Sequence, residues 1–115
     1  MQTILVISDN TILLQIMVKS LQEADYTVKS QKLGDVLDFN NIDCLVIDVQ
    51  DANKWIPIVK ECATKNIATL VTISSQEERI EAVMEKADEC IQKPFTVELL
   101  KIKVGNAIDN HNRNS

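Results

Sequence analysis

The chain has 115 residues, which is enough for one compact domain and too few for two. With 17 acidic against 12 basic residues its net charge is -5, and a surface of this sign repels a nucleic-acid backbone. The longest apolar runs, residues 4–7 and 45–47, are far shorter than the ~20 residues that cross a bilayer, and the first residues show neither a basic n-region nor a cleavage site. We therefore expect a soluble, cytoplasmic domain that binds neither nucleic acid nor a membrane directly.

The cysteines and the histidine predict no metal or redox chemistry. Cys44, Cys62 and Cys90 are an odd number, at spacings that match neither a zinc site nor a Cys-x-x-Cys motif. We expect reduced thiols that pack as small apolar residues, as in a reducing compartment. His111 is the only histidine and falls in the polar segment 109–115, which is typical of a frayed terminus or the start of a linker.

The N-terminal part of the chain predicts strand, helix, strand and a short helix in turn. An unbroken apolar run at residues 3–8 is typical of a strand buried on both faces of a parallel sheet. Residues 11–24 carry apolar side chains at helical spacing, with Asn10 placed to cap the helix. Residues 26–31 alternate as a more exposed strand, and residues 33–39 provide at most two turns of a second helix.

The same alternation continues through the rest of the chain. Apolar runs predict buried strands at 43–48, 68–74 and 90–92, and amphipathic patterns predict helices at 53–65, 77–86 and 97–108. In the helix at 77–86 we expect an acidic outer side, and the side chains expected to face inward are Ile80, Val83, Met84 and Ala87. Five strands that alternate with five helices predict a three-layer α/β sandwich, (βα)5, with a five-stranded parallel sheet.

Polar side chains close four of these strands. They are Ser8 and Asp9 after the first strand, Asp48 after the third, Ser74 after the fourth and Lys93 after the fifth. Each could serve only as a cap, a turn residue or a solvated charge, but the carboxyl ends of parallel strands meet at one edge, where such sheets bind ligands. Phosphoryl transfer to a carboxylate suits this set, with Asp9 and Asp48 as ligands of Mg²⁺. Lys93 would then supply a positive charge to the phosphoryl group, and Ser74 a hydroxyl donor.

Four segments carry a resemblance to a known family. They are residues 4–10 (ILVISDN), 45–48 (LVID), 73–75 (ISS) and 87–95 (ADECIQKPF), of which the ending Lys-Pro-Phe before an amphipathic helix is the most specific. In these segments, and in the order of elements over essentially the whole chain, the sequence resembles the receiver domains of bacterial two-component response regulators, the CheY-like superfamily. The resemblance implies a flavodoxin-like fold, with a receiver domain at 1–108 and a polar tail or the start of a linker at 109–115.

The resemblance also assigns roles to the residues at the strand ends. It implies that Asp48 is the phosphoacceptor and that Mg²⁺ is held by Asp9, Asp48 and the main-chain carbonyl of Gln50. It implies contacts of Ser74 and Lys93 with the phosphoryl group, and a cis peptide bond between Lys93 and the proline that follows it. We therefore expect a signalling domain rather than an enzyme.

Several positions depart from the family pattern. Receivers usually carry two adjacent acids after the first strand, and here Ser8 replaces the first of them, so we expect Mg²⁺ to bind only weakly. The loop at 49–54 lacks the usual proline and glycine. Cys90 stands where the family has an aromatic residue that swings inward on activation. Parts of the switching apparatus are thus missing.

Two functional hypotheses remain open. In the first, Asp48 accepts a phosphoryl group from a sensor histidine kinase and the domain switches its interaction surface, either alone or with a C-terminal effector domain. In the second, the chain is an atypical receiver that acts as a phosphorylation-independent protein-interaction or dimerisation module. A homodimer could form through the fourth helix, fifth strand and fifth helix, as the resemblance implies for one group of receivers. A flavodoxin-like enzyme or flavin carrier is disfavoured because Gly34 and Gly105 are isolated and form no phosphate-binding loop.

Overall fold

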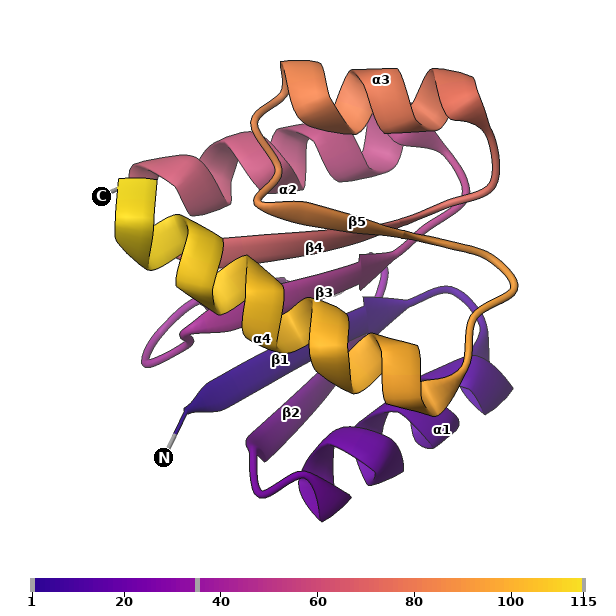
Figure 1. Cartoon of the computed structure of the whole chain (residues 1–115), viewed down its shortest axis with the longest axis vertical. Coiled ribbons are helices and arrows are strands. Elements are labelled where there is room, and N and C mark those ends of the chain that lie inside the picture. Colours follow the sequence, from indigo (N-terminus) through magenta and orange to yellow (C-terminus); the bar gives the residue numbers. More distant parts are fainter. Residues whose placement is uncertain (1, 35, 115) are drawn as a thin grey trace.

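The computed structural model describes residues 2–34 and 36–114, within which five β-strands and four α-helices are formed (Figure 1). The strands are β1 (Thr3–Ser8), β2 (Thr27–Lys32), β3 (Cys44–Asp48), β4 (Ala68–Ile73) and β5 (Glu89–Gln92). The helices are α1 (Thr11–Glu23), α2 (Ala52–Thr64), α3 (Gln76–Met84) and α4 (Val97–Asn114). All five strands pair in parallel, in the order β2-β1-β3-β4-β5. The predicted α/β class with a five-stranded parallel sheet is confirmed.

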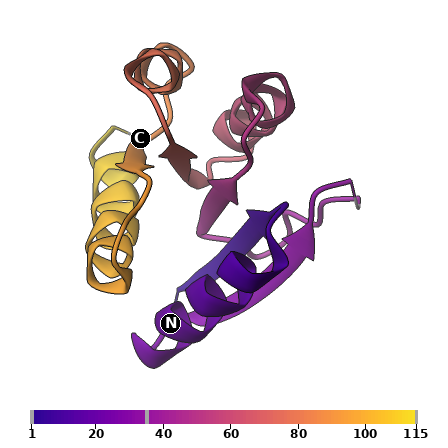
Figure 2. The ribbon, with the colours of Figure 1, turned by 90° about the vertical axis from the view of Figure 1, so that its right-hand side faces the viewer.

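The sheet lies between two layers of helices, as Figure 2 shows. α1 and α4 cover one face, and α2 and α3 cover the other. Successive residues of β1 point to opposite faces, so that Ile4 packs in the core beneath α1 and α4 while Leu5 packs in the core beneath α2 and α3. Because β1, β3 and β4 are buried on both faces, they appear in the sequence as unbroken apolar runs.

Side-chain caps begin the helices that leave the carboxyl edge of the sheet. Asn10 Oδ1 accepts the main-chain N–H groups of Ile12 and Leu13, each at 3.1 Å, so its predicted role as N-cap of α1 is confirmed. Asp51 caps α2 and Ser75 caps α3 in the same way. These caps let the chain turn within a few residues after β1, β3 and β4, which keeps the polar strand ends together at one edge.

The second helix, predicted at 33–39, is absent from the part of that segment that the structure describes, residues 33, 34 and 36–39. Gly34 adopts a φ of 102°, which a right-handed helix cannot include, so the predicted segment is broken near its start. Leu33, Leu37 and Phe39 pack against the core beneath α2, where Trp55 is completely buried. This part of the sheet is therefore covered by loop side chains in place of a helix.

The last helix is longer than predicted, because α4 continues past residue 108 to Asn114. Asn110 Nδ2 donates to the main-chain carbonyl of Asp88 at 3.3 Å, and the ring of His111 contacts side chains of two neighbouring turns. The segment predicted as a frayed tail is thus helical through Asn114 and is held by its polar side chains. Neither α4 nor any other helix in the described chain combines the length and the apolar character that a bilayer crossing requires.

The inward face predicted for the fourth helix of the sequence is wrong for most of its residues. α3 buries only Ala82, whereas Ile80, Val83 and Met84 are 52%, 68% and 73% exposed. Ala87, just after the helix, does pack partly against the core. α3 lies over β4 and the edge strand β5, which has four residues. Among the described residues no strand pairs with the outer edge of β5, so this end of the sheet offers little apolar surface to the short helix.

Candidate functional site

Asp48 is the last residue of β3 and lies at the carboxyl edge of the sheet. It is completely buried, with 0% of its surface exposed. The parallel register pairs Asp48 with Ser8 of β1, and the pairing of Ile47 with Val71 places Thr72 of β4 on its other side. Side chains from both neighbouring strands can therefore reach its carboxylate.

Three donors hold the carboxylate of Asp48. The hydroxyl of Ser8 donates to Oδ2 at 2.6 Å, and the hydroxyl of Thr72 donates to Oδ1 at 2.8 Å. The ammonium group of Lys93 forms an ion pair with Oδ1, at 2.5 Å. A carboxylate at this depth is strongly unfavourable unless it is paired and hydrogen-bonded, so these donors are what allow a charge to be buried here.

Lys93 follows β5 and reaches back across the edge of the sheet. Its main-chain N–H donates to the carbonyl of Ile73 at 2.8 Å, and its peptide bond to Pro94 is cis, as the resemblance implied. Its side chain is 25% exposed, whereas Asp48 is completely buried. Leu13, Pro94 and Phe95 form an apolar hollow beside it.

Asp9 and Gln50, two of the residues expected to bind Mg²⁺, lie on the rim of the same edge. Both are exposed, and together with Asn10 and Ile12 they line an open hollow. The main-chain N–H of Asp9 donates to the main-chain carbonyl of Asp48 at 3.3 Å. The backbones are thus adjacent, while the carboxylate of Asp48 turns to its three donors below the rim.

This arrangement does not fit a magnesium site. Mg²⁺ needs oxygen ligands with available lone pairs in near-octahedral geometry. Both oxygens of Asp48 already accept hydrogens, and the position that the family fills with a further acid holds Ser8, which donates its proton to Asp48. Within residues 2–34 and 36–114, no group of three or more histidine, cysteine and acidic side chains is placed to hold a metal ion.

The hydroxyl that reaches Asp48 from β4 is that of Thr72, which was not predicted, while the expected contact of Ser74 with a phosphoryl group stays a prediction. Ser74 lies just beyond the end of β4 and is exposed, and its main-chain N–H donates to Oε2 of Glu78 at 2.9 Å. Thr72 is 2% exposed. Its signal in the sequence was a polar residue within a buried strand. Ser8 was predicted to lie at the same edge of the sheet, but its bond to Asp48 was not expected.

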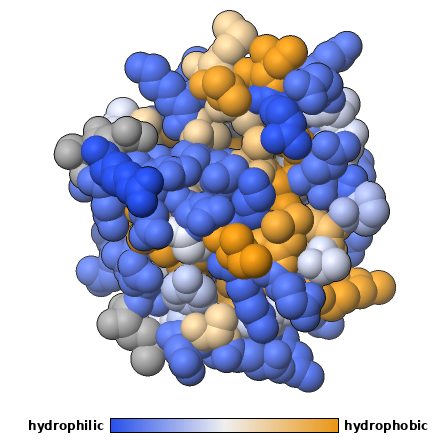
Figure 3. Space-filling view, in the orientation of Figure 1, coloured by the Kyte–Doolittle hydropathy of each residue, from blue (hydrophilic) through white to orange (hydrophobic). Residues whose placement is uncertain are grey.

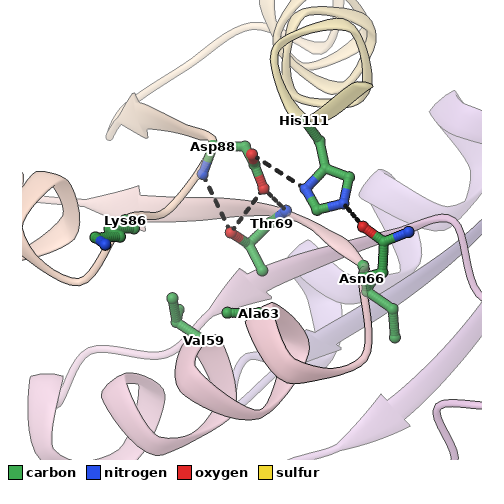
Figure 4. Close-up of a pocket in the computed structure, with 8 residues that line it drawn as sticks. Val59, Ala63, Asn66, Thr69, Lys86, Asp88 and His111 are labelled. Carbon is green, nitrogen blue, oxygen red and sulfur yellow. Dashed lines mark hydrogen bonds and ion pairs between the residues drawn. The ribbon is translucent and has the colours of Figure 1, made fainter. Parts of the chain in front are cut away.

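A second polar cluster lies at the amino ends of β4 and β5, where the end of α4 meets the preceding turns (Figure 4). Nδ1 of His111 is 3.3 Å from Oδ1 of Asp88, and Nε2 is 2.8 Å from Oδ1 of Asn66. Oδ2 of Asp88 accepts the main-chain N–H of Thr69 at 2.8 Å. These hydrogen bonds connect α4 to the turns before β4 and β5, beside a small pocket that Val59 lines. The cluster therefore fastens the end of α4 to the sheet.

The three cysteines are buried and unbridged, as the sequence predicted. Burial raises the pKa of the Cys62 thiol to about 12, and burial also raises the pKa of Cys44. Nη1 of Arg79 donates to Sγ of Cys90 at 3.4 Å. The thiols therefore pack as apolar residues with little thiolate character at Cys44 and Cys62.

Comparison with known proteins identifies the class to which this fold belongs. A response regulator receiver domain protein from Clostridium thermocellum is 25% identical and superposes with a TM-score of 0.83 over 100% of both chains. The non-phosphorylated receiver domain of HemR from Leptospira biflexa is 20% identical, with a TM-score of 0.79 over 94% of each chain. DrrB, an OmpR/PhoB homolog from Thermotoga maritima, is 22% identical with a TM-score of 0.81, and the match covers 95% of this chain and 53% of DrrB. No protein-family model matches this sequence, and neither does any curated protein.

These similarities define a CheY-like α/β domain. The chain has the fold of a response regulator receiver domain, in agreement with the resemblance seen in its sequence. The carboxyl edge at which Asp48 and Lys93 meet is the edge that the fold offers for a functional site.

Proposed function

We propose that this chain is an atypical receiver domain that works as a protein-interaction module without phosphorylation of Asp48. The observation that carries the proposal is the enclosure of Asp48, which is 0% exposed and binds Ser8, Thr72 and Lys93 through its carboxylate. A carboxylate nucleophile needs a free oxygen in line with the leaving group, and a cation that offsets the charge of the phosphoryl group. These donors would have to move before a phosphoryl donor could approach either oxygen.

The face formed by α3, β5 and α4 is the surface that would make the contacts. Ile80, Val83 and Met84 of α3 are more than half exposed, and Ile102 of α4 is 58% exposed. In Figure 3 apolar side chains gather over α3 at the top of the view and again over α4 near its centre. Exposed apolar groups that cluster on one face favour association, so a homodimer through this face is part of the proposal.

Three charged side chains on this face form contacts within the chain. Nζ of Lys103 is 3.0 Å from Oε1 of Glu89, and Asp88 is bonded to His111 and Thr69. The internal bonds of Lys103, Glu89 and Asp88 leave the apolar side chains of α3 as the main source of affinity in the proposed contact.

A second candidate is favoured by the direct contact between Lys93 and Asp48. In that case a sensor histidine kinase would donate a phosphoryl group to Asp48, and the ammonium group of Lys93 would pair with the phosphoryl oxygens. A C-terminal effector domain could then receive the signal. The match to 53% of DrrB shows that a segment of this kind also occurs within a longer response regulator.

Intact-mass spectrometry separates the two candidates. After incubation with acetyl phosphate and millimolar Mg²⁺, the protein is expected to keep its mass, because Asp48 is enclosed. A receiver domain with both acids after its first strand, treated in parallel, should gain one phosphoryl group. Asp48→Asn reports any phosphorylation at other residues. A mass increase in the parent protein that Asp48→Asn abolishes would contradict the proposal and establish Asp48 as the phosphoacceptor.

A further inference from the structure

Ser8 occupies the position of a family acid and yet is bonded directly to Asp48. Its side chain is buried, with 2% of the residue exposed, and Oγ lies 2.6 Å from Oδ2 of Asp48. We propose that Ser8 closes this site to divalent cations, because its hydroxyl supplies the positive partner of Oδ2 that a bound metal would otherwise be. The inference rests on the proposed function, since it explains how Asp48 is kept enclosed.

The hydroxyl of Ser8 is held in this direction by its neighbours. Its two acceptors are Oδ2 of Asp48 at 2.6 Å and the main-chain carbonyl of Asn10 at 3.2 Å, and the single proton goes to the shorter, charged one. The main-chain N–H of Asn10 donates to Oγ at 3.0 Å. Asn10 is itself fixed as the N-cap of α1. Ser8 is therefore a positioned donor, and no rearrangement is needed for it to satisfy Asp48.

Charge balance explains why a serine closes the site and an acid would open it. The pair of Asp48 and Lys93 is neutral as it stands, and Ser8 adds no charge. A carboxylate at residue 8 would lie beside that of Asp48 at a position that is 2% exposed, where two like charges repel strongly. A divalent cation relieves such repulsion. The charge of residue 8, more than the presence of Asp9 and Asp48, thus decides whether the edge has affinity for Mg²⁺.

The test compares thermal unfolding in EDTA and in millimolar Mg²⁺ for four proteins. The parent melting temperature should be the same in both buffers. Ser8→Asp should melt below the parent in EDTA and should be raised by Mg²⁺, by roughly 10 °C when the concentration is about one hundred times Kd. Ser8→Asn is the matched control, because asparagine has the shape of aspartate without its charge, and its melting temperature should not change with Mg²⁺.

Ser8→Ala keeps the experiment decisive if Ser8→Asp does not fold. Without the hydroxyl, Oδ2 of Asp48 loses its donor, so this variant should melt below the parent and gain a small stabilisation by Mg²⁺. Saturable stabilisation of the parent by Mg²⁺ would overturn the inference, because the cation would then enter despite Ser8. The inference would also be overturned if Mg²⁺ stabilised neither Ser8→Asp nor Ser8→Ala, or if it stabilised Ser8→Asn as strongly as Ser8→Asp. Failure of the proposed function is a separate observation, namely a phosphoryl mass on Asp48 of the parent protein.

Discussion

Removing Lys93 should destabilise the domain more than neutralising Asp48, although both changes break the same ion pair. In Lys93→Met, Asp48 keeps its charge at a position with 0% exposure and retains only the hydroxyl donors of Ser8 and Thr72. In Asp48→Asn, the ammonium group of Lys93 is the charge that loses its partner. Its side chain is already 25% exposed and can turn to water.

The magnitudes follow from this difference in access to solvent. Removal of one partner of a buried pair costs about 3–5 kcal/mol, and the lower end applies to Lys93→Met because two hydroxyl donors remain on Asp48. Asp48→Asn keeps the shape and one acceptor, so it should cost about 1.5 kcal/mol, as expected for a lost hydrogen bond to a charged group. The double variant should be more stable than Lys93→Met alone, because no uncompensated charge is left in the core.

Equilibrium unfolding in urea measures these differences without adding salt that would screen the pair. With a slope of about 1–3 kcal/mol per M, a loss of about 3 kcal/mol lowers the midpoint of Lys93→Met by roughly 1–3 M. Lys54→Met, at an exposed lysine of α2, is the matched control and should stay within about 0.5 kcal/mol of the parent. The reasoning is refuted if Asp48→Asn is as destabilising as Lys93→Met, or if the effects of the two changes simply add.

Three further outcomes are expected. Thr72→Val should lower the free energy of unfolding by about 1.5–3 kcal/mol, because it removes a donor to buried Asp48, whereas Ser74→Ala should change it by less than about 0.5 kcal/mol. Urea unfolding measures both variants, and the reverse order would contradict the contact between Thr72 and Asp48. His111→Leu should lower the free energy of unfolding by about 1 kcal/mol and speed amide exchange in the last turn of α4, because the bonds to Asp88 and Asn66 are lost. Unchanged exchange in that turn would show that these bonds do not hold the helix. Val83→Glu should abolish association of the protein, measured by light scattering over a series of concentrations. The same change at Val36, which is 92% exposed on the loop before β3, should leave association unchanged. A parent protein that stays monomeric at every concentration would exclude the face of α3, β5 and α4 as a dimer contact.

Local pattern was sufficient for the strands, because each strand is recognised by residues within its own length. The run at residues 3–8 coincides with β1, and the run at 43–48 differs from β3 by one residue at its start. Buried parallel strands are apolar on both faces, and this property does not depend on which strand lies next to them. The meeting of Asp48 and Lys93 was also foreseeable, since the carboxyl ends of parallel strands share one edge.

Helix faces and ends were less predictable, because they depend on what lies opposite. The spacing of Ile80, Val83 and Met84 is that of a buried stripe, but α3 lies over the edge of the sheet and presents them to solvent. The polar residues after 108 resemble a tail until His111 is placed beside turns from other parts of the chain. Periodicity identifies an apolar or polar face, but it carries no information on whether a partner exists for it.

Only the tertiary structure decided which donors surround Asp48. Thr72 and Ser74 both carry a hydroxyl group, and the register between β3 and β4 places that of Thr72 beside Asp48. Ser8 looks like the loss of a charge until its hydroxyl is seen 2.6 Å from Asp48. These contacts join residues 24 and 40 positions apart. Their partners are determined by how the strands align in space, which no local property of either segment specifies.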